Sequence, residues 1–150
     1  MKTGKRNNFF IFLISIFITF TIYSQDKINI TDTIMHYAIK IQLPVNYKRD
    51  LFCYGEECFL TYYYQDSIIV SIFSGGLQRL PLLAIDNGFI PYKKDTTENC
   101  IRTFGCKDGK YWREDSYKDI RIYYRDVPMD KKCLFESILN NFIFEEITCY

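Results

Sequence analysis

The sequence is poor in glycine and proline and contains a single histidine. Seven glycines and four prolines among 150 residues exclude collagen-like and low-complexity chains, and an aromatic share of 18% favours a packed domain built largely of strands. His36 alone cannot build a histidine-rich metal site. With 48% hydrophobic residues, the chain has enough apolar surface for a core, which excludes intrinsic disorder. The length is typical of one domain.

The chain also lacks the short motifs of common enzyme classes. It contains no G-x-S-x-G, H-E-x-x-H, phosphate-binding loop or dinucleotide fingerprint. Its adjacent acids, Glu56-Glu57, Glu114-Asp115 and Glu145-Glu146, would point to opposite faces of a strand, so an acid–base pair would need carboxylates from different strands. We therefore expect these pairs to be solvated, and we predict no catalytic residue, no metal and no cofactor. We interpret His36 as a strand residue near a sheet edge.

The first 24 residues have the composition of a secretory signal peptide. Lys2, Lys5 and Arg6 precede an apolar run from Phe9 to Ile22, and polar residues resume at Ser24. The run is shorter than the roughly 20 residues that a helix needs to cross a bilayer. We predict cleavage after Ser24 and export of residues 25–150, as a single domain, to the periplasm or the cell exterior. The alternative is an uncleaved membrane anchor.

Removal of that segment changes the charge of the protein. All 18 acids but only 16 of the 19 bases follow Ser24, so the net charge falls from +1 to −2. A nearly neutral domain has no long-range field that would hold a polyanion. We therefore expect neither nucleic acid nor an acidic membrane surface as a partner.

Six cysteines lie in the predicted exported part: Cys53, Cys58, Cys100, Cys106, Cys133 and Cys149. An even number in a small exported domain predicts disulfides. Short intervening segments favour Cys53–Cys58 and Cys100–Cys106, and Cys133–Cys149 would follow if a helix and a returning strand end on the same side. The sequence alone does not exclude other pairings. Zinc binding would need a second matched pair, and a redox enzyme would need C-x-x-C.

Hydrophobic periodicity predicts an α+β domain. Alternation from Tyr37 to Leu43 indicates a strand that Pro44 ends, and a helix is predicted from Asp130, as its N-cap, to Asn140-Asn141. We expect further strands at 58–64 and 67–73, joined as a hairpin, and at 89–93, 99–104, 109–117, 120–125 and 142–147. Residues 25–32 are interpreted as a loose lead-in, and 77–85 as ambiguous between helix and loop. The result is an antiparallel sheet of six or seven strands, with the apolar stripe of the helix on one face: Leu134, Phe135, Ile138, Leu139 and Phe142.

Three segments carry a resemblance to a known group of proteins. The strand Ile39-Lys40-Ile41-Gln42-Leu43-Pro44, residues 120–128 and the helix sequence Phe135-Glu136-Ser137-Ile138-Leu139-Asn140-Asn141-Phe142 resemble the PsbP/Mog1/DcrB-like superfamily. Its members often begin with an F-x-I-x-L-P strand and finish with a helix that reads roughly F-x-x-I-L-x-S-F. The resemblance implies an α/β sandwich used as an adaptor or binding platform, seldom as an enzyme. It transfers no functional residue, and the six cysteines depart from the usual pattern.

The aromatic residues suggest a binding face. Tyr62-Tyr63-Tyr64, Trp112 and Tyr123-Tyr124 place rings on both faces of adjacent strands, and one helix can cover only one face. We predict an exposed face that would suit a protein or glycan partner in the envelope; it comprises Tyr63, Arg121, Tyr123 and Arg125. The rings could instead fill the core. The leading interpretation is a binding or adaptor module without catalytic activity; a small envelope hydrolase and a purely structural envelope protein are the alternatives.

Overall fold

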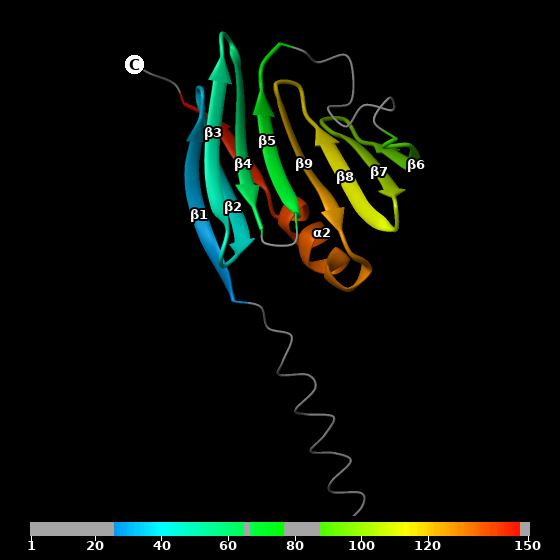
Figure 1. The fold of residues 1–150 in the computed structure, drawn as a ribbon. Coiled ribbons are helices and arrows are strands. Elements are labelled where there is room, and N and C mark those ends of the chain that lie inside the picture. Colours follow the sequence, from blue (N-terminus) through cyan, green and yellow to red (C-terminus); the bar gives the residue numbers. More distant parts are fainter. Residues whose placement is uncertain (1–25, 65–66, 77–87, 148–150) are drawn as a thin grey trace, which may run out of the picture.

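The computed structural model describes residues 26–64, 67–76 and 88–147. In these ranges the chain is α+β, with ten strands and one short α-helix (Figure 1). The elements are β1 (Lys27–Ile34), β2 (Tyr37–Pro44), β3 (Lys48–Tyr54), β4 (Glu57–Tyr63), β5 (Ile69–Ser74), β6 (Pro91–Thr96), β7 (Ile101–Lys107), β8 (Lys110–Ser116), β9 (Ile120–Val127), the 3-10 helix η2 (Met129–Lys131), α2 (Lys132–Asn140) and β10 (Ile143–Glu146). The predicted signal peptide, the turn at 65–66 and the ambiguous segment 77–85 lie outside the described residues.

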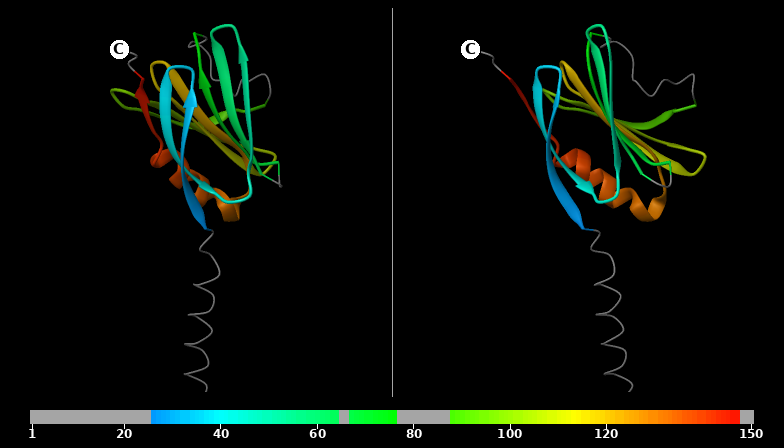
Figure 2. Two further views of the ribbon diagram at one scale, coloured as in Figure 1. Left: turned by 90° about the vertical axis from the view of Figure 1, so that its left-hand side faces the viewer. Right: turned by 60° about the vertical axis from the view of Figure 1, so that its left-hand side comes forward.

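The strands form two antiparallel sheets where the sequence predicted one. The small sheet has the order β1-β2-β10, and the large sheet has the order β3-β4-β5-β9-β8-β7-β6. The small sheet and helix α2 lie on the same side of the large sheet (Figure 2). The single-sheet prediction is wrong because β2 pairs with β1 and with the distant strand β10, and not with β3.

Most of the predicted strands are confirmed, and two strands were missed. The alternation in β2 and the hairpin of β4 and β5 are as expected. Of the predicted lead-in 25–32, residues 27–32 belong to β1, which pairs with β2 along its whole length, so that prediction is wrong for them. Strand β3 has no buried residue, and so it lacks the alternation that identifies a half-buried strand.

The main core lies between the large sheet on one side and the small sheet and α2 on the other. Phe135, Ile138 and Leu139 of the helix are buried there, as the stripe predicted, beside buried apolar residues of β2, β4, β5 and β9. Burial of side chains of this size contributes about 1.5–3 kcal/mol each. Asp130 is not the N-cap: it lies within η2, and Lys131 precedes α2 without a side-chain capping bond.

The register of the large sheet defines its two faces. One row runs across neighbouring strands through Arg49, Tyr62, Val70, Tyr124 and Arg113. The Tyr62 hydroxyl donates a hydrogen bond to a residue of β1, and Arg113 donates to residues of α2. This row therefore faces the small sheet and the helix, and we call that side the inner face. Residues that alternate with it point to the opposite side, the outer face.

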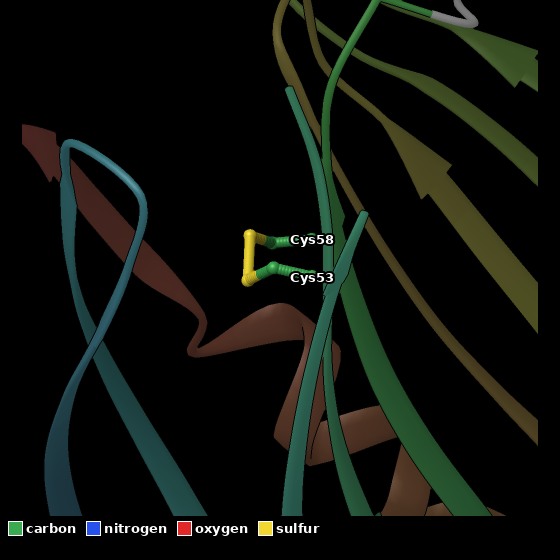
Figure 3. Close-up of a disulfide and its surroundings, with 2 residues drawn as sticks. All are labelled: Cys53 and Cys58. Carbon is green, nitrogen blue, oxygen red and sulfur yellow. A yellow bond between two sulfur atoms is a disulfide. The ribbon is translucent and has the colours of Figure 1, made fainter. Parts of the chain in front are cut away.

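The structure contains the predicted disulfide Cys53–Cys58. The two residues lie opposite each other in the β3–β4 hairpin, with a Cα–Cα distance of 4.1 Å. The sulfurs project on the side of the small sheet (Figure 3), which is the inner face. Gly55 supplies the positive φ, 61°, at the first position of the two-residue turn.

The predicted pair Cys100–Cys106 is wrong. Both cysteines are free, because β7 runs extended between them at about 3.3 Å per residue and so separates them far beyond the reach of a disulfide. Cys133 is exposed and forms no disulfide with a described residue. Cys149, its predicted partner, lies outside the described residues. The predicted pairing assumed a strand that returns along the helix, whereas β10 continues away from α2 (Figure 1).

Candidate functional site

The outer face of the large sheet brings together the four residues of the predicted binding face. Tyr63 on β4 and Arg125 on β9 lie in one row, with Ile69 of β5 between them. Tyr123 lies in the next row, and Arg121 in the row after that. Successive rows on one face of a sheet are two residues apart along each strand, so the four side chains share one continuous surface.

Exposure separates these four residues. Tyr63 is 41% exposed and the Arg125 side chain is 39% exposed, whereas Arg121 is buried and lies 3.7 Å from a carboxylate oxygen of Glu114. Tyr123 is partly buried, and burial raises the pKa of its phenol although a hydrogen bond with Ser71 opposes the shift. The prediction that Arg121 belongs to an exposed face is therefore wrong. Of the two arginines, only Arg125 has a partly exposed side chain.

The centre of the outer face is polar and buried. Thr61 and Ser71 join their hydroxyls at 2.8 Å across β4 and β5, and Glu114 follows in the same row beyond Tyr123. The expectation that Glu114-Asp115 is solvated is wrong, because both residues are buried. Their strand, β8, is paired on both sides, which sequence alone did not indicate.

An exposed aromatic strip covers the β3 side of the outer face. We define the strip as Phe52, Tyr54, Phe59 and Tyr63; Phe73 continues the row of Phe59 but is buried. One row holds Phe52, Phe59 and Phe73, and the last two rings lie 4.8 Å apart. Phe52 is 61% and Tyr54 is 79% exposed. Sequence reasoning missed these two residues because it did not predict β3.

Trp112 does not belong to the exposed aromatic surface. It is buried and packs edge-on against Phe89, with ring centroids 6.0 Å apart. Its indole lies over Gly105 on the neighbouring strand, where a Cβ atom would come within 2.1 Å of the ring. The glycine is required here by this close approach.

The inner face contains a buried charged network that sequence reasoning missed. Arg113 donates two hydrogen bonds of 2.6 Å to Asp115, and it also donates to Glu136 at 2.5 Å and to Asn140 at 2.8 Å on α2. The Tyr124 hydroxyl donates to the second oxygen of Glu136 at 2.6 Å. Burial works against the charge of Arg113, but the hydrogen bonds and charges of Asp115 and Glu136 raise its pKa. Burial raises the pKa of Asp115, and Arg113 opposes that shift. The network connects β8 and β9 to the helix.

Cys100 lies near one end of this network. Burial and the charge of Asp115 raise the pKa of its thiol, and burial together with Cys100 raises the pKa of Tyr117 to about 12. A thiol with a raised pKa holds less of the reactive thiolate at neutral pH. Cys100 is therefore poorly suited to act as a nucleophile.

A cavity of about 410 Å³ lies between the tips of the two sheets. His36, Tyr37, Glu56 and Asp119 contribute to its lining. His36 lies in the β1–β2 turn, and its ring packs against Tyr37 with centroids 4.3 Å apart. Burial, Asp119 and Glu146 raise the pKa of Tyr37.

A second cavity of about 580 Å³ lies on the outward side of the small sheet. Amide side chains contribute much of its lining: Asn29, Gln42, Asn140 and Asn141. All four amides are already engaged: Gln42 donates to Asn29 at 3.3 Å, Asn140 accepts from Arg113 at 2.8 Å, and Asn141 donates to the carbonyl of Ser137 at 2.8 Å.

Comparisons with protein-family models, with curated proteins and with solved structures gave no match for this chain. Within residues 26–64, 67–76 and 88–147, no helix has the length and hydropathy needed to span a membrane. Nor do three or more His, Cys, Asp or Glu side chains in that part of the chain come together as a metal site.

Proposed function

We propose that this protein is an exported binding or adaptor module, periplasmic or secreted, which recognises a protein or glycan partner through the outer face of its large sheet. The observation that carries the proposal is the exposure of Phe52, Tyr54 and Tyr63 on one face, with Arg125 in the row of Tyr63. Tyrosine, phenylalanine and arginine side chains provide most of the binding energy in many interfaces. A surface of this kind on a small domain points to recognition.

Two features support export. The N-terminal segment has the composition of a signal peptide, and the Cys53–Cys58 disulfide is compatible with maturation in an oxidising compartment. For the fold, we propose a PsbP/Mog1/DcrB-like sandwich. The helix that packs beside a mostly antiparallel sheet supports this assignment.

We propose that the module has no catalytic activity. Asp115 and Glu136 come from different elements, as an acid–base pair would require, but both are bound to Arg113. An ion pair of this kind holds a carboxylate in its charged form and occupies its oxygens. The arrangement favours a structural role for both acids.

The proposal is tested by capture of the partner with the oxidised domain, residues 25–150, from an envelope extract of the source organism, followed by identification of the captured protein or glycan. We expect alanine at Phe52, Tyr54 and Tyr63 together to reduce capture at least about tenfold, because the most exposed aromatic side chains of the face would be lost. Tyr92→Ala is the matched control, since Tyr92 is 57% exposed and lies on β6 at the far edge of the sheet. Capture that is unchanged by the triple substitution would overturn the binding face.

A second candidate is a small envelope hydrolase. Glu56 and Asp119 come from different hairpins and line one cavity with His36 and Tyr37, which is the arrangement that paired carboxylates need. The test is release of reducing ends or peptides from purified envelope polymer. Hydrolysis that Glu56→Gln and Asp119→Asn both abolish would favour this candidate over the binding module.

A further inference from the structure

Strand β3 ends the large sheet and has one free edge. It pairs with β4 alone. Tyr54 and Glu57 flank the two-residue turn, which makes them a hydrogen-bonded pair. The next pair, Cys53 and Cys58, has the short Cα separation, 4.1 Å, of a non-hydrogen-bonded pair. Because the two kinds of pair alternate, Arg49, Leu51 and Cys53 direct their backbone N–H and C=O groups to the free edge.

Two of the other three edges formed by the described strands are protected against strand addition. Strand β6 carries Pro91 and three charged residues, and β10 is four residues long and ends in two glutamates. Strand β1 lacks these features, but its exposed central positions hold the small polar residues Asn29, Thr31 and Thr33, and it has no aromatic side chain. Proline, charge and shortness each discourage the addition of another strand. In β3, by contrast, Leu51-Phe52-Cys53-Tyr54 is an exposed, uncharged run.

The free edge is held rigid at both ends. The Cys53–Cys58 disulfide fixes its C-terminal end. At its N-terminal end, Arg49 donates hydrogen bonds of 2.5 and 2.8 Å to Asp32 of β1. A preformed edge reduces the ordering entropy that a partner must overcome.

The charges of β3 indicate which side chains an added strand would need. Lys48 and Asp50 lie on the outer face of β3, and neither forms an ion pair with another described residue. An added antiparallel strand would satisfy them with an acid opposite Lys48 and a base opposite Asp50. Opposite Phe52 and Tyr54 it would place apolar side chains, which extend the aromatic strip.

A second copy of this chain matches the edge poorly. Antiparallel self-pairing centred on Leu51 would use the backbone groups of all three residues that point to the free edge, Arg49, Leu51 and Cys53. It places Lys48 opposite Tyr54 and Asp50 opposite Phe52, however, so both charges remain without a countercharge. Centring the pair on Arg49 would match Lys48 with Asp50 of the other copy, but only Lys48, Arg49 and Asp50 of β3 would overlap. Arg49 would face its own counterpart, which is destabilising, and Phe52 and Tyr54 would gain no strand partner from β3.

We propose that β3 is a docking edge for an extended peptide segment of a protein partner, which adds to the sheet as an antiparallel strand. From its N-terminus, the side chains that this segment places on the outer face are apolar, apolar, basic and acidic, opposite Tyr54, Phe52, Asp50 and Lys48. This inference rests on the proposed binding function and names a protein as the partner. Main-chain hydrogen bonds hold such a strand, and alternate side chains select it.

The test uses a synthetic fluorescent peptide, Val-Thr-Ile-Thr-Lys-Thr-Glu, whose binding to the oxidised domain is followed by fluorescence anisotropy. We expect saturable binding, and binding at least about tenfold weaker for the charge-exchanged peptide Val-Thr-Ile-Thr-Glu-Thr-Lys. Leu51→Pro removes an N–H group that points to the free edge and leaves the ladder to β4 intact, so we expect a loss of about tenfold or more. Leu51→Ala is the matched control and retains binding within a few-fold.

A second arm removes any dependence on the folding of the proline variant. Methylation of the backbone nitrogen at the central threonine of the peptide blocks the same pairing from the ligand side, and we expect it to abolish binding. Equal binding of the two charge patterns, or binding that survives both blocks, overturns the docking edge. A dimer that Leu51→Pro converts to a monomer in sedimentation would also overturn it, in favour of a second copy. If Tyr63→Ala reduces capture of the envelope partner but Leu51→Pro does not, the proposed function stands without this edge.

Discussion

The two faces of the large sheet are built from the same strands but have different roles. The inner face is closed by the small sheet and α2, and the buried Arg113 on it is paired with Asp115 and Glu136. The outer face has a buried polar centre and an exposed aromatic strip beside it. Alternation along each strand produces this contrast. The inner residues hold the fold together, and the outer residues leave a surface that a partner can cover.

Arg113→Leu should give the largest loss of stability. The substitution leaves the buried carboxylate of Asp115 with only Arg102, at 3.5 Å, in place of two hydrogen bonds from Arg113, and breaking a buried ion pair in this way costs about 3–5 kcal/mol. Arg125→Leu on the outer face is the control and should change the free energy of unfolding by less than about 1 kcal/mol. Urea denaturation followed by circular dichroism measures both. If Arg113→Leu is as stable as Arg125→Leu, the claim that the inner face holds the fold together more strongly than the outer face is wrong.

Gly105→Ala should destabilise the outer face by a smaller amount. A Cβ atom at this position would come within 2.1 Å of the Trp112 indole, so the ring must move, and overpacking of this kind costs about 1–3 kcal/mol. Because Trp112 is the only tryptophan, its fluorescence reports the displacement directly, and we expect a shift to longer wavelength. Gly76→Ala is the control, since nothing lies within 4 Å of its added Cβ atom. Unchanged emission in Gly105→Ala would show that the ring is not seated on the glycine.

The parts of the fold that could be predicted are those whose signal lies within one segment. The alternation in β2, the buried stripe of α2 and the tight Cys53–Cys58 hairpin each depend on neighbouring residues. The small sheet could not be predicted in the same way, because β10 pairs with β2 across most of the chain. Nothing in either segment specifies that pairing.

The same distinction applies to the candidate site: features set within one strand could be predicted, and features that depend on other strands could not. Alternation placed Tyr63 and Arg125 on one face correctly. It could not tell that Arg121, on the same face, is buried, because that depends on neighbours from other strands. The Arg113–Glu136 pair spans 23 residues, and charge composition alone gives no sign of such a partner. Edge strand β3 escaped notice because full exposure on both faces removes periodicity.

Substitution of Asp32 should give the smallest of these changes in the free energy of unfolding, and the change should depend on pH. Burial opposes its charge, but hydrogen bonds from Arg49, Thr33 and Tyr62 hold the pKa of Asp32 below its usual value of 3.8. A carboxyl whose pKa is lower in the folded protein stabilises it above the unfolded value, and this contribution is lost as the pH falls through the folded value. The interaction ties β1 to the inner row of the large sheet, but the Arg49 side chain is 42% exposed, which limits its contribution to about 1 kcal/mol.

Asp32→Asn should therefore be less stable than the unsubstituted protein at pH 6, and the difference should shrink as the pH falls below 3.8. Asp50→Asn, on the outer side of β3, is the matched control, because it makes the same chemical change at a carboxylate that forms no ion pair with another described residue. Urea denaturation of the three proteins at several pH values gives the comparison, in which the other carboxyls cancel. A difference that persists undiminished at low pH would mean that the amide disturbs packing between the sheets. In that case the charge of Asp32 would not be what holds β1 against the inner face.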